Sequence, residues 1–106
     1  MPVRRLLLMG QARRPLPERL PAKLLQIRTQ LGLTQEQMAD RLKRIKSPPQ
    51  PGMISRYETG QREPTLLVLL EYARIAGVSM EVLVDDSLYL PKKLPANLGR
   101  DRAGER

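Results

Sequence analysis

Charged side chains are distributed unevenly along this chain of 106 residues, which carries a formal net charge of +8. Residues 20–64 contain eight basic and four acidic side chains, whereas residues 65–90 contain one basic and four acidic side chains. Both ends of the chain are basic again. Lysine and arginine at this density neutralise phosphates, and an acidic rear behind a basic face orients a protein on a polyanion. The pattern therefore favours a nucleic-acid ligand.

The chain lacks the side chains on which most enzymes and metal sites depend. It has no histidine and no cysteine, so the usual general base, the commonest zinc ligands and any disulfide are missing. No pair of carboxylates stands at a spacing that suggests acid–base catalysis. We expect no enzymatic activity, no cofactor and no metal, and a composition without cysteine is compatible with a reducing cytoplasm.

Apolar stretches are too short for a membrane span or a leader peptide. The longest near the start runs only from Leu6 to Met9, and Arg13 and Arg14 follow it closely. We therefore expect no membrane partner and a cytoplasmic location.

Hydrophobic spacing and capping residues predict an all-α domain of five helices in residues 20–86. Thr34 and Gln37 have the spacing of a capping box, and Pro51 suits the first turn of a helix. Before this domain, residues 1–19 form a basic arm, and residues 87–106 form an extended tail that is basic after Pro91. The helices are expected near residues 21–31, 34–46, 51–59, 66–76 and 80–84.

Two stretches of the domain resemble the Cro/C1-repressor type of helix-turn-helix, also called the XRE family. The first is Leu24-x-x-Ile27-Arg28-x-x-Leu31-Gly32-Leu33-Thr34-Gln35-x-x-Met38-Ala39. The second is Ile54-Ser55-x-Tyr57-Glu58-x-Gly60-x-Arg62-x-Pro64. The resemblance covers about residues 20–85. It implies a lambda-repressor-like fold and a transcriptional regulator that binds double-stranded DNA.

The resemblance also implies roles for individual residues. The helix at 51–59 matches the recognition helix, which lies in the major groove. Base contacts would then come from Gln50, Met53, Ser55 and Arg56. Phosphate contacts would come from Gln35 and Arg62, while Arg28 and Glu58 would form a partly buried ion pair rather than two solvated surface charges.

The junction between the two central helices departs from the family pattern. Residues 43–52 are about five residues longer than the usual tight turn, so either the first helix is extended or a proline-rich loop follows it. Lys43, Arg44 and Lys46 in this junction would contact phosphates, or would merely occupy a helix end that favours cations. Pro51 and Gly52 have no side chain that could read a base.

Apolar residues beyond those needed for a core favour a homodimer, as a two-fold operator would require. The residues of the expected interface are Leu67, Val68, Ile75 and Val82. Alternatively, Leu88–Leu90 and Leu94 of the tail could cover such residues within a monomer.

Two other functions remain open on the same fold. One is the DNA-binding antitoxin of a toxin–antitoxin pair, because the basic tail could wrap a toxin. The other is a protein-interaction adaptor that has lost DNA binding. The arginine pairs Arg4/Arg5 and Arg13/Arg14 of the arm either solubilise the chain or reach into a minor groove.

Overall fold

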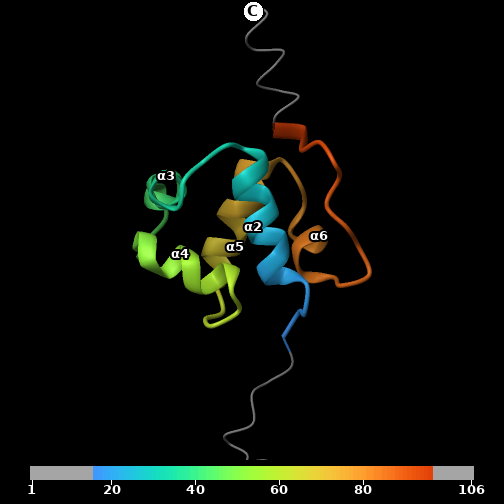
Figure 1. Cartoon of the computed structure of the whole chain (residues 1–106), viewed down its shortest axis with the longest axis horizontal. Coiled ribbons are helices and arrows are strands. Elements are labelled where there is room, and N and C mark those ends of the chain that lie inside the picture. The colour runs from blue at the N-terminus through green and yellow to red at the C-terminus, as the bar shows by residue number, and fades with distance from the viewer. Residues whose placement is uncertain (1–15, 97–106) are drawn as a thin grey trace, which may run out of the picture.

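The computed structural model describes residues 16–96, which form a small bundle of helices without a strand in that range (Figure 1). α2 lies at the centre, α3 and α4 lie on one side of it, and α6 lies on the other side. The elements are α2 (Leu20–Gln30), α3 (Gln35–Arg41), the 3-10 helix η1 (Leu42–Arg44), α4 (Pro51–Glu58), α5 (Leu66–Ala76) and α6 (Met80–Val84). The predicted all-α class is confirmed.

Local capping signals explain where several of these helices begin and end. The Thr34 hydroxyl accepts a hydrogen bond from the Gln37 N–H at 3.0 Å, and the Gln37 side chain accepts one from the Thr34 N–H at 2.9 Å. This reciprocal pair is the predicted capping box. Thr65 caps α5 in a similar way, and Gly77 ends that helix in the left-handed conformation at φ 80°.

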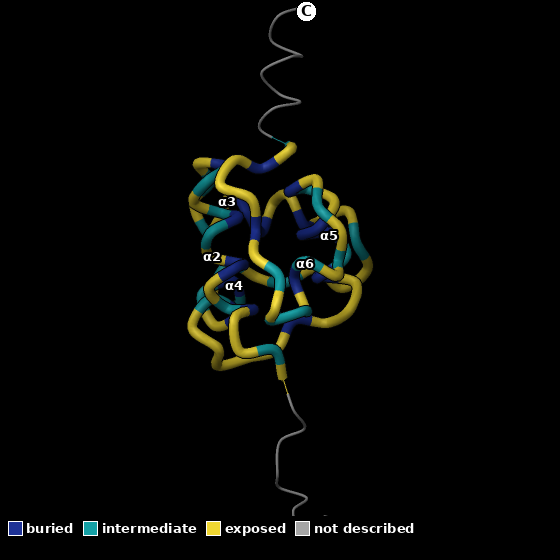
Figure 2. Tube along the Cα trace, turned by 90° about the vertical axis from the view of Figure 1, so that its right-hand side faces the viewer, coloured by how far each residue is buried: buried dark blue, intermediate teal, exposed yellow. Residues whose placement is uncertain are grey.

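The hydrophobic core lies between α2 and the helices around it (Figure 2). Aliphatic side chains fill it, together with the rings of Tyr57 and Tyr72. Its largest fully buried side chains are Tyr72, Leu24, Ile27, Met38, Leu42, Ile54, Leu83, Leu94 and Val68.

One expectation for α5 was wrong. Val68 was expected at a dimer interface but is 1% exposed, whereas Leu66, two residues earlier, is 74% exposed. The buried stripe of the helix passes through Val68, Tyr72 and Ala76, which are spaced four residues apart and so lie on one face. Because Val68 is part of the core, it cannot contribute to an interface between two folded copies.

The predicted end of the domain at residue 86 lies inside the packed structure. Leu90 is 8% exposed and Leu94 is fully buried in the core. A methyl group placed on Gly77 would lie 3.0 Å from the Ala96 backbone nitrogen, so the chain passes close to the end of α5. The segment up to Ala96 is therefore part of the domain, because it supplies apolar side chains that the helices need.

The predicted start of the domain is also bound to this C-terminal segment. The Asp86 carboxylate accepts hydrogen bonds from the backbone N–H groups of Glu18 and Arg19, at 2.9 and 3.0 Å. These bonds hold the pKa of Asp86 below its ordinary value. Nearby, the buried Lys23 ammonium donates to the carbonyl oxygens of Val82 and Asp85, at 2.7 and 2.9 Å.

Candidate nucleic-acid interface

α4 presents one face to the core and the other to solvent. Ile54 and Tyr57 stand three residues apart and are buried, with 0% and 6% of their surface exposed. On the outer side, Gln50 and Arg56 are exposed. Gln50 is the N-cap residue but makes no side-chain capping bond, so its amide is not used in capping the start of the helix. These two side chains are the accessible polar groups among the four predicted base contacts.

The other two predicted base contacts are less accessible. Met53 is half-buried and packs against the core, and Ser55 is half-buried. Gly52 lies at the start of α4, where nothing is found within 4 Å of a methyl group placed on it. The start of the helix is therefore open to solvent on the side that Gly52 occupies.

An ion pair fixes α4 against α2. Arg28 Nε donates to Glu58 Oε2 at 2.6 Å and Arg28 Nη2 donates to Glu58 Oε1 at 3.0 Å, in a bidentate arrangement. Only 15% of the Arg28 side chain and 5% of the Glu58 side chain are exposed. The hydrogen bond with Glu58 raises the pKa of Arg28 above its ordinary value. The ion pair between Arg28 and Glu58 that the family resemblance predicts is therefore present.

Two further hydrogen bonds extend this contact to the start of α3. Arg28 Nη1 donates to the Leu33 carbonyl at 3.0 Å, and Gln35 Nε2 donates to Glu58 Oε1 at 3.2 Å. The network thus connects α2, the turn after it, α3 and α4. Gln35 was expected to contact a phosphate, but here one amide hydrogen is engaged with Glu58, which leaves the second for a ligand.

The long junction between α3 and α4 is a loop and not an extension of the helix. α-Helical geometry ends at Arg41, η1 continues to Arg44, and Ile45 is extended. Ser47 has a φ of 56°, and Pro48 and Pro49 follow it. A residue before a proline is sterically kept out of the helical region, which explains why no helix can run through Ser47 and Pro48 to join α4. Of the two alternatives for this junction, the proline-rich loop is correct.

The basic residues of the junction differ in whether they are paired. Lys43 forms an exposed salt bridge with Asp40 at 2.9 Å, and this hydrogen bond raises the pKa of Lys43. Arg44 contacts the buried carboxylate of Glu71 at 3.4 Å. Within residues 16–96, Lys46 has no salt bridge in the structure, so its charge is available to a ligand.

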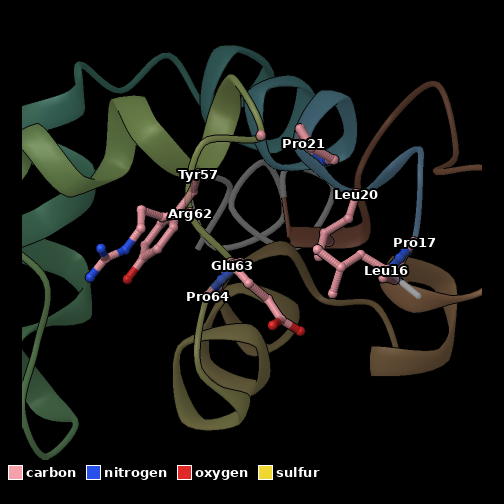
Figure 3. A pocket seen from close by; sticks show the side chains of 9 residues that line it. Leu16, Pro17, Leu20, Pro21, Tyr57, Arg62, Glu63 and Pro64 are labelled. Carbon is pink, nitrogen blue, oxygen red and sulfur yellow. The ribbon is translucent and has the colours of Figure 1, made fainter. Parts of the chain in front are cut away.

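Arg62 lies in the exposed loop after α4, close to Tyr57 (Figure 3). Burial raises the pKa of the Tyr57 hydroxyl, and the Arg62 charge opposes that rise. No described carboxylate forms a salt bridge with Arg62.

The predicted dimer residues do not form one exposed patch. Leu67 is 52% exposed, whereas Ile75 and Val82 are half-buried and pack against the core. Leu66, beside Leu67, is 74% exposed, so these two side chains expose apolar surface at the first turn of α5.

Sequence reasoning missed two buried charges. Lys23 is 4% exposed and Glu71 is 2% exposed. Lys23 stands three residues after Leu20 and four before Ile27, so helical spacing placed it on the inner face of α2. Glu71 lies between Leu70 and Tyr72 in an apolar run of the sequence. A buried carboxylate needs a cation nearby, and Glu71 forms salt bridges with Arg44 and Arg74.

A helix-turn-helix family model matches residues 24–83. This match covers more than half of the chain, from the first turns of α2 to Leu83 of α6. The chain belongs to the Cro/C1-type helix-turn-helix family. Neither the comparison with curated proteins nor that with solved structures gives a match.

Membership of the Cro/C1-type family makes this chain a helix-turn-helix DNA-binding regulator in general terms. The family match includes the long junction, while the packed segment from residue 84 to Ala96 lies beyond it. In residues 16–96, no cluster of three or more acidic side chains could hold a metal ion, and no helix is long and apolar enough to cross a membrane.

Proposed function

We propose that this protein is a transcriptional regulator that prefers particular sequences of double-stranded DNA and inserts α4 into the major groove. The observation that carries the proposal is the bidentate contact between Arg28 and Glu58, which holds α4 with Arg56 directed outward and exposed. A rigidly held helix with an exposed arginine can read a base edge, because the guanidinium fork matches guanine O6 and N7.

Base readout would depend on few side chains. Arg56 is the main candidate, and the Gln50 amide can pair with adenine in a bidentate manner. Met53 and Ser55 are half-buried and would contribute smaller contacts. Because Pro51 and Gly52 offer no polar side chain, we expect a modest sequence preference on top of a strong phosphate contribution.

Phosphate contacts would come from both edges of the helix-turn-helix. Gln35 lies at the start of α3, and Arg62 lies in the loop after α4. Lys46 adds a charge in the junction that forms no salt bridge with any residue between 16 and 96. Lys43 and Arg44 contribute only if DNA competes with Asp40 and Glu71 for them, since both already form salt bridges.

A homodimer is part of the proposal. Leu66 and Leu67 expose apolar surface at the start of α5, only a few residues after the Arg62 loop. The variant Leu67→Glu should remain folded but shift toward the monomer in sedimentation analysis, because a charge there opposes burial. Tyr89→Glu is the matched control, because Tyr89 is 67% exposed on another segment. The dimer is contradicted if the wild-type chain is a monomer both without DNA and when bound to DNA.

Selection of bound sequences from a random duplex pool tests sequence preference directly. We expect an enriched consensus with two-fold symmetry and half-sites about one helical turn apart. Arg56→Ala should relax the preference at one position per half-site, by about 1–3 kcal/mol. If the selected pool matches the input, the protein has no sequence preference.

A second function, an adaptor without DNA binding, is favoured only by the lack of reading side chains at Pro51 and Gly52. Fluorescence anisotropy with duplex DNA at several salt concentrations distinguishes the two, because an adaptor would give no binding and therefore no salt dependence. The antitoxin alternative has less support than the sequence suggested. Its tail would have to wrap a toxin, yet Leu90 and Leu94 are packed into the domain's own core.

A further inference from the structure

Glu58 holds the side chain of Gln35 as well as that of Arg28. Its Oε2 accepts a hydrogen bond from Arg28 Nε at 2.6 Å. Its Oε1 accepts two, from Arg28 Nη2 at 3.0 Å and from Gln35 Nε2 at 3.2 Å. Only 5% of the Glu58 side chain is exposed, so little water competes for these oxygens. The amide of Gln35 is therefore anchored to a buried ion pair.

The contact with Glu58 decides which end of the Gln35 amide faces the ion pair. A carboxylate can only accept hydrogen bonds, so it binds the NH2 end of an amide and not the carbonyl end. One hydrogen of Gln35 Nε2 is engaged with Glu58, which leaves the second hydrogen on the same nitrogen as a donor. A phosphate is an acceptor too, so it binds a donor and is repelled by a carbonyl oxygen. The orientation that Glu58 imposes is the one that a phosphate ligand requires.

Arg28 fixes the backbone next to Gln35 and neutralises the charge of Glu58. Arg28 Nη1 donates to the Leu33 carbonyl at 3.0 Å, two residues before Gln35. Gln35 itself is half-buried, so part of its side chain is accessible to a ligand. Because the Arg28 charge offsets the Glu58 charge at close range, the carboxylate does not prevent a phosphate from binding at Gln35.

We propose that Glu58 is a positioning residue for DNA binding, because it orients the Gln35 amide toward a backbone phosphate of the duplex. The ion pair then supports a DNA contact in addition to holding α4 against α2. The proposal rests on the proposed function, in which Gln35 contacts a phosphate. An amide that is already oriented binds more tightly, since its freedom is lost before the DNA arrives.

A double-mutant cycle on DNA affinity measures whether the contact of Gln35 depends on Glu58. The probe is a fluorescein-labelled duplex of random sequence and about 30 base pairs, titrated with the full-length chain at about 100 mM salt. Gln35→Ala is measured in the wild-type chain and in the Arg28→Met/Glu58→Leu background, which removes both charges of the pair together. Arg62→Ala is the matched control in both backgrounds, because Arg62 is expected to contact a phosphate from the loop after α4.

We expect Gln35→Ala to weaken binding about tenfold in the wild-type chain, because a hydrogen bond to a charged group is lost. In the Arg28→Met/Glu58→Leu background, the same substitution should weaken binding by less than about twofold, because the amide is no longer oriented. Arg62→Ala should weaken binding by the same factor in both backgrounds, as sites without shared partners do.

Several results would overturn the proposal. Gln35→Ala could leave the wild-type affinity unchanged, or could cost an equal or larger factor in the background without the pair. A larger factor would show that Glu58 competes with the phosphate for Gln35. The proposal also fails if Arg62→Ala loses its effect in that background, since the pair would then act on α4 as a whole. A wild-type chain that does not bind the duplex overturns the proposed function too, whereas equal factors in both backgrounds leave that function standing.

Glu58→Gln replaces the double variant in the cycle if Arg28→Met/Glu58→Leu does not fold. This substitution keeps the size of the side chain but leaves one acceptor oxygen for the donors of Arg28 and Gln35. We expect Gln35→Ala to weaken binding by only about threefold in that background. The full wild-type loss in the Glu58→Gln background overturns the proposal.

Discussion

Arg28 of α2 and Glu58 of α4 are joined by two hydrogen bonds of 2.6 and 3.0 Å, although thirty residues separate them in the chain. Replacing Glu58 with alanine would leave the guanidinium without its anion in a site where 15% of the side chain is exposed. We expect Glu58→Ala to lower the free energy of unfolding by about 3 kcal/mol in urea denaturation. The double variant Arg28→Met/Glu58→Leu should recover part of that loss.

Lys43→Ala provides a control for Glu58→Ala, because it breaks the fully exposed pair with Asp40 and should leave the urea midpoint unchanged. Equal midpoints for wild type and Glu58→Ala would show that the pair does not support α4.

Gly52 offers a way to separate folding from DNA binding. The space beside it is open, so Gly52→Tyr should change the melting temperature little while placing a ring at the start of α4. If α4 enters the major groove, the added ring blocks this insertion. The DNA affinity should then fall at least about tenfold, or about 1.4 kcal/mol. Lys92→Tyr, on the C-terminal segment, should leave affinity unchanged. If Gly52→Tyr binds DNA as tightly as wild type, the start of α4 is not part of the DNA interface.

Tyr72 is fully buried, and its hydroxyl has no hydrogen-bond partner among the described residues. Burial, supported by the nearby Glu58 charge, raises the pKa of this hydroxyl well above its usual range. The folded state therefore holds the proton more tightly than the unfolded state. The stability that results is fully present below pH 10 and declines as the pH rises further, since only the unfolded chain ionises readily.

We expect Tyr72→Phe to be at least as stable as wild type at pH 7, because it removes an unpartnered buried polar group. Its urea midpoint should also decline less above pH 10. Ultraviolet titration should show that Tyr72 ionises only when the chain unfolds. An ordinary tyrosine titration of Tyr72 in the folded chain would contradict its burial.

Leu94 tests whether the C-terminal segment is part of the domain. Its side chain is fully buried, so Leu94→Ala should lower the free energy of unfolding by about 2–5 kcal/mol. The control is Tyr89→Ala in the same segment, which removes a side chain that is 67% exposed and should cost much less. If both substitutions have the same small effect, the segment is not required for the core.

Local sequence signals were sufficient to find the five α-helices of this protein, although the second ends at Arg41 and not near residue 46. The capping box of Thr34 and Gln37 involves residues three apart, so its geometry follows from the backbone of one helical turn. The resemblance to the family predicted the contact between Arg28 and Glu58, which the structure confirms, whereas the role of α4 as recognition helix stays a prediction. These features depend on short-range spacing or on a motif that a single sequence displays.

Other features were decided by packing between segments far apart in the chain. Whether Val68 or Leu66 turns inward depends on which face of α5 the other helices cover. The burial of Leu94 depends on the C-terminal segment passing close to Gly77. The position of the backbone at Arg19 depends on a hydrogen bond to Asp86, which lies 67 residues later in the chain. Helical periodicity identifies apolar faces, but only the tertiary arrangement determines which of them meet and which remain exposed.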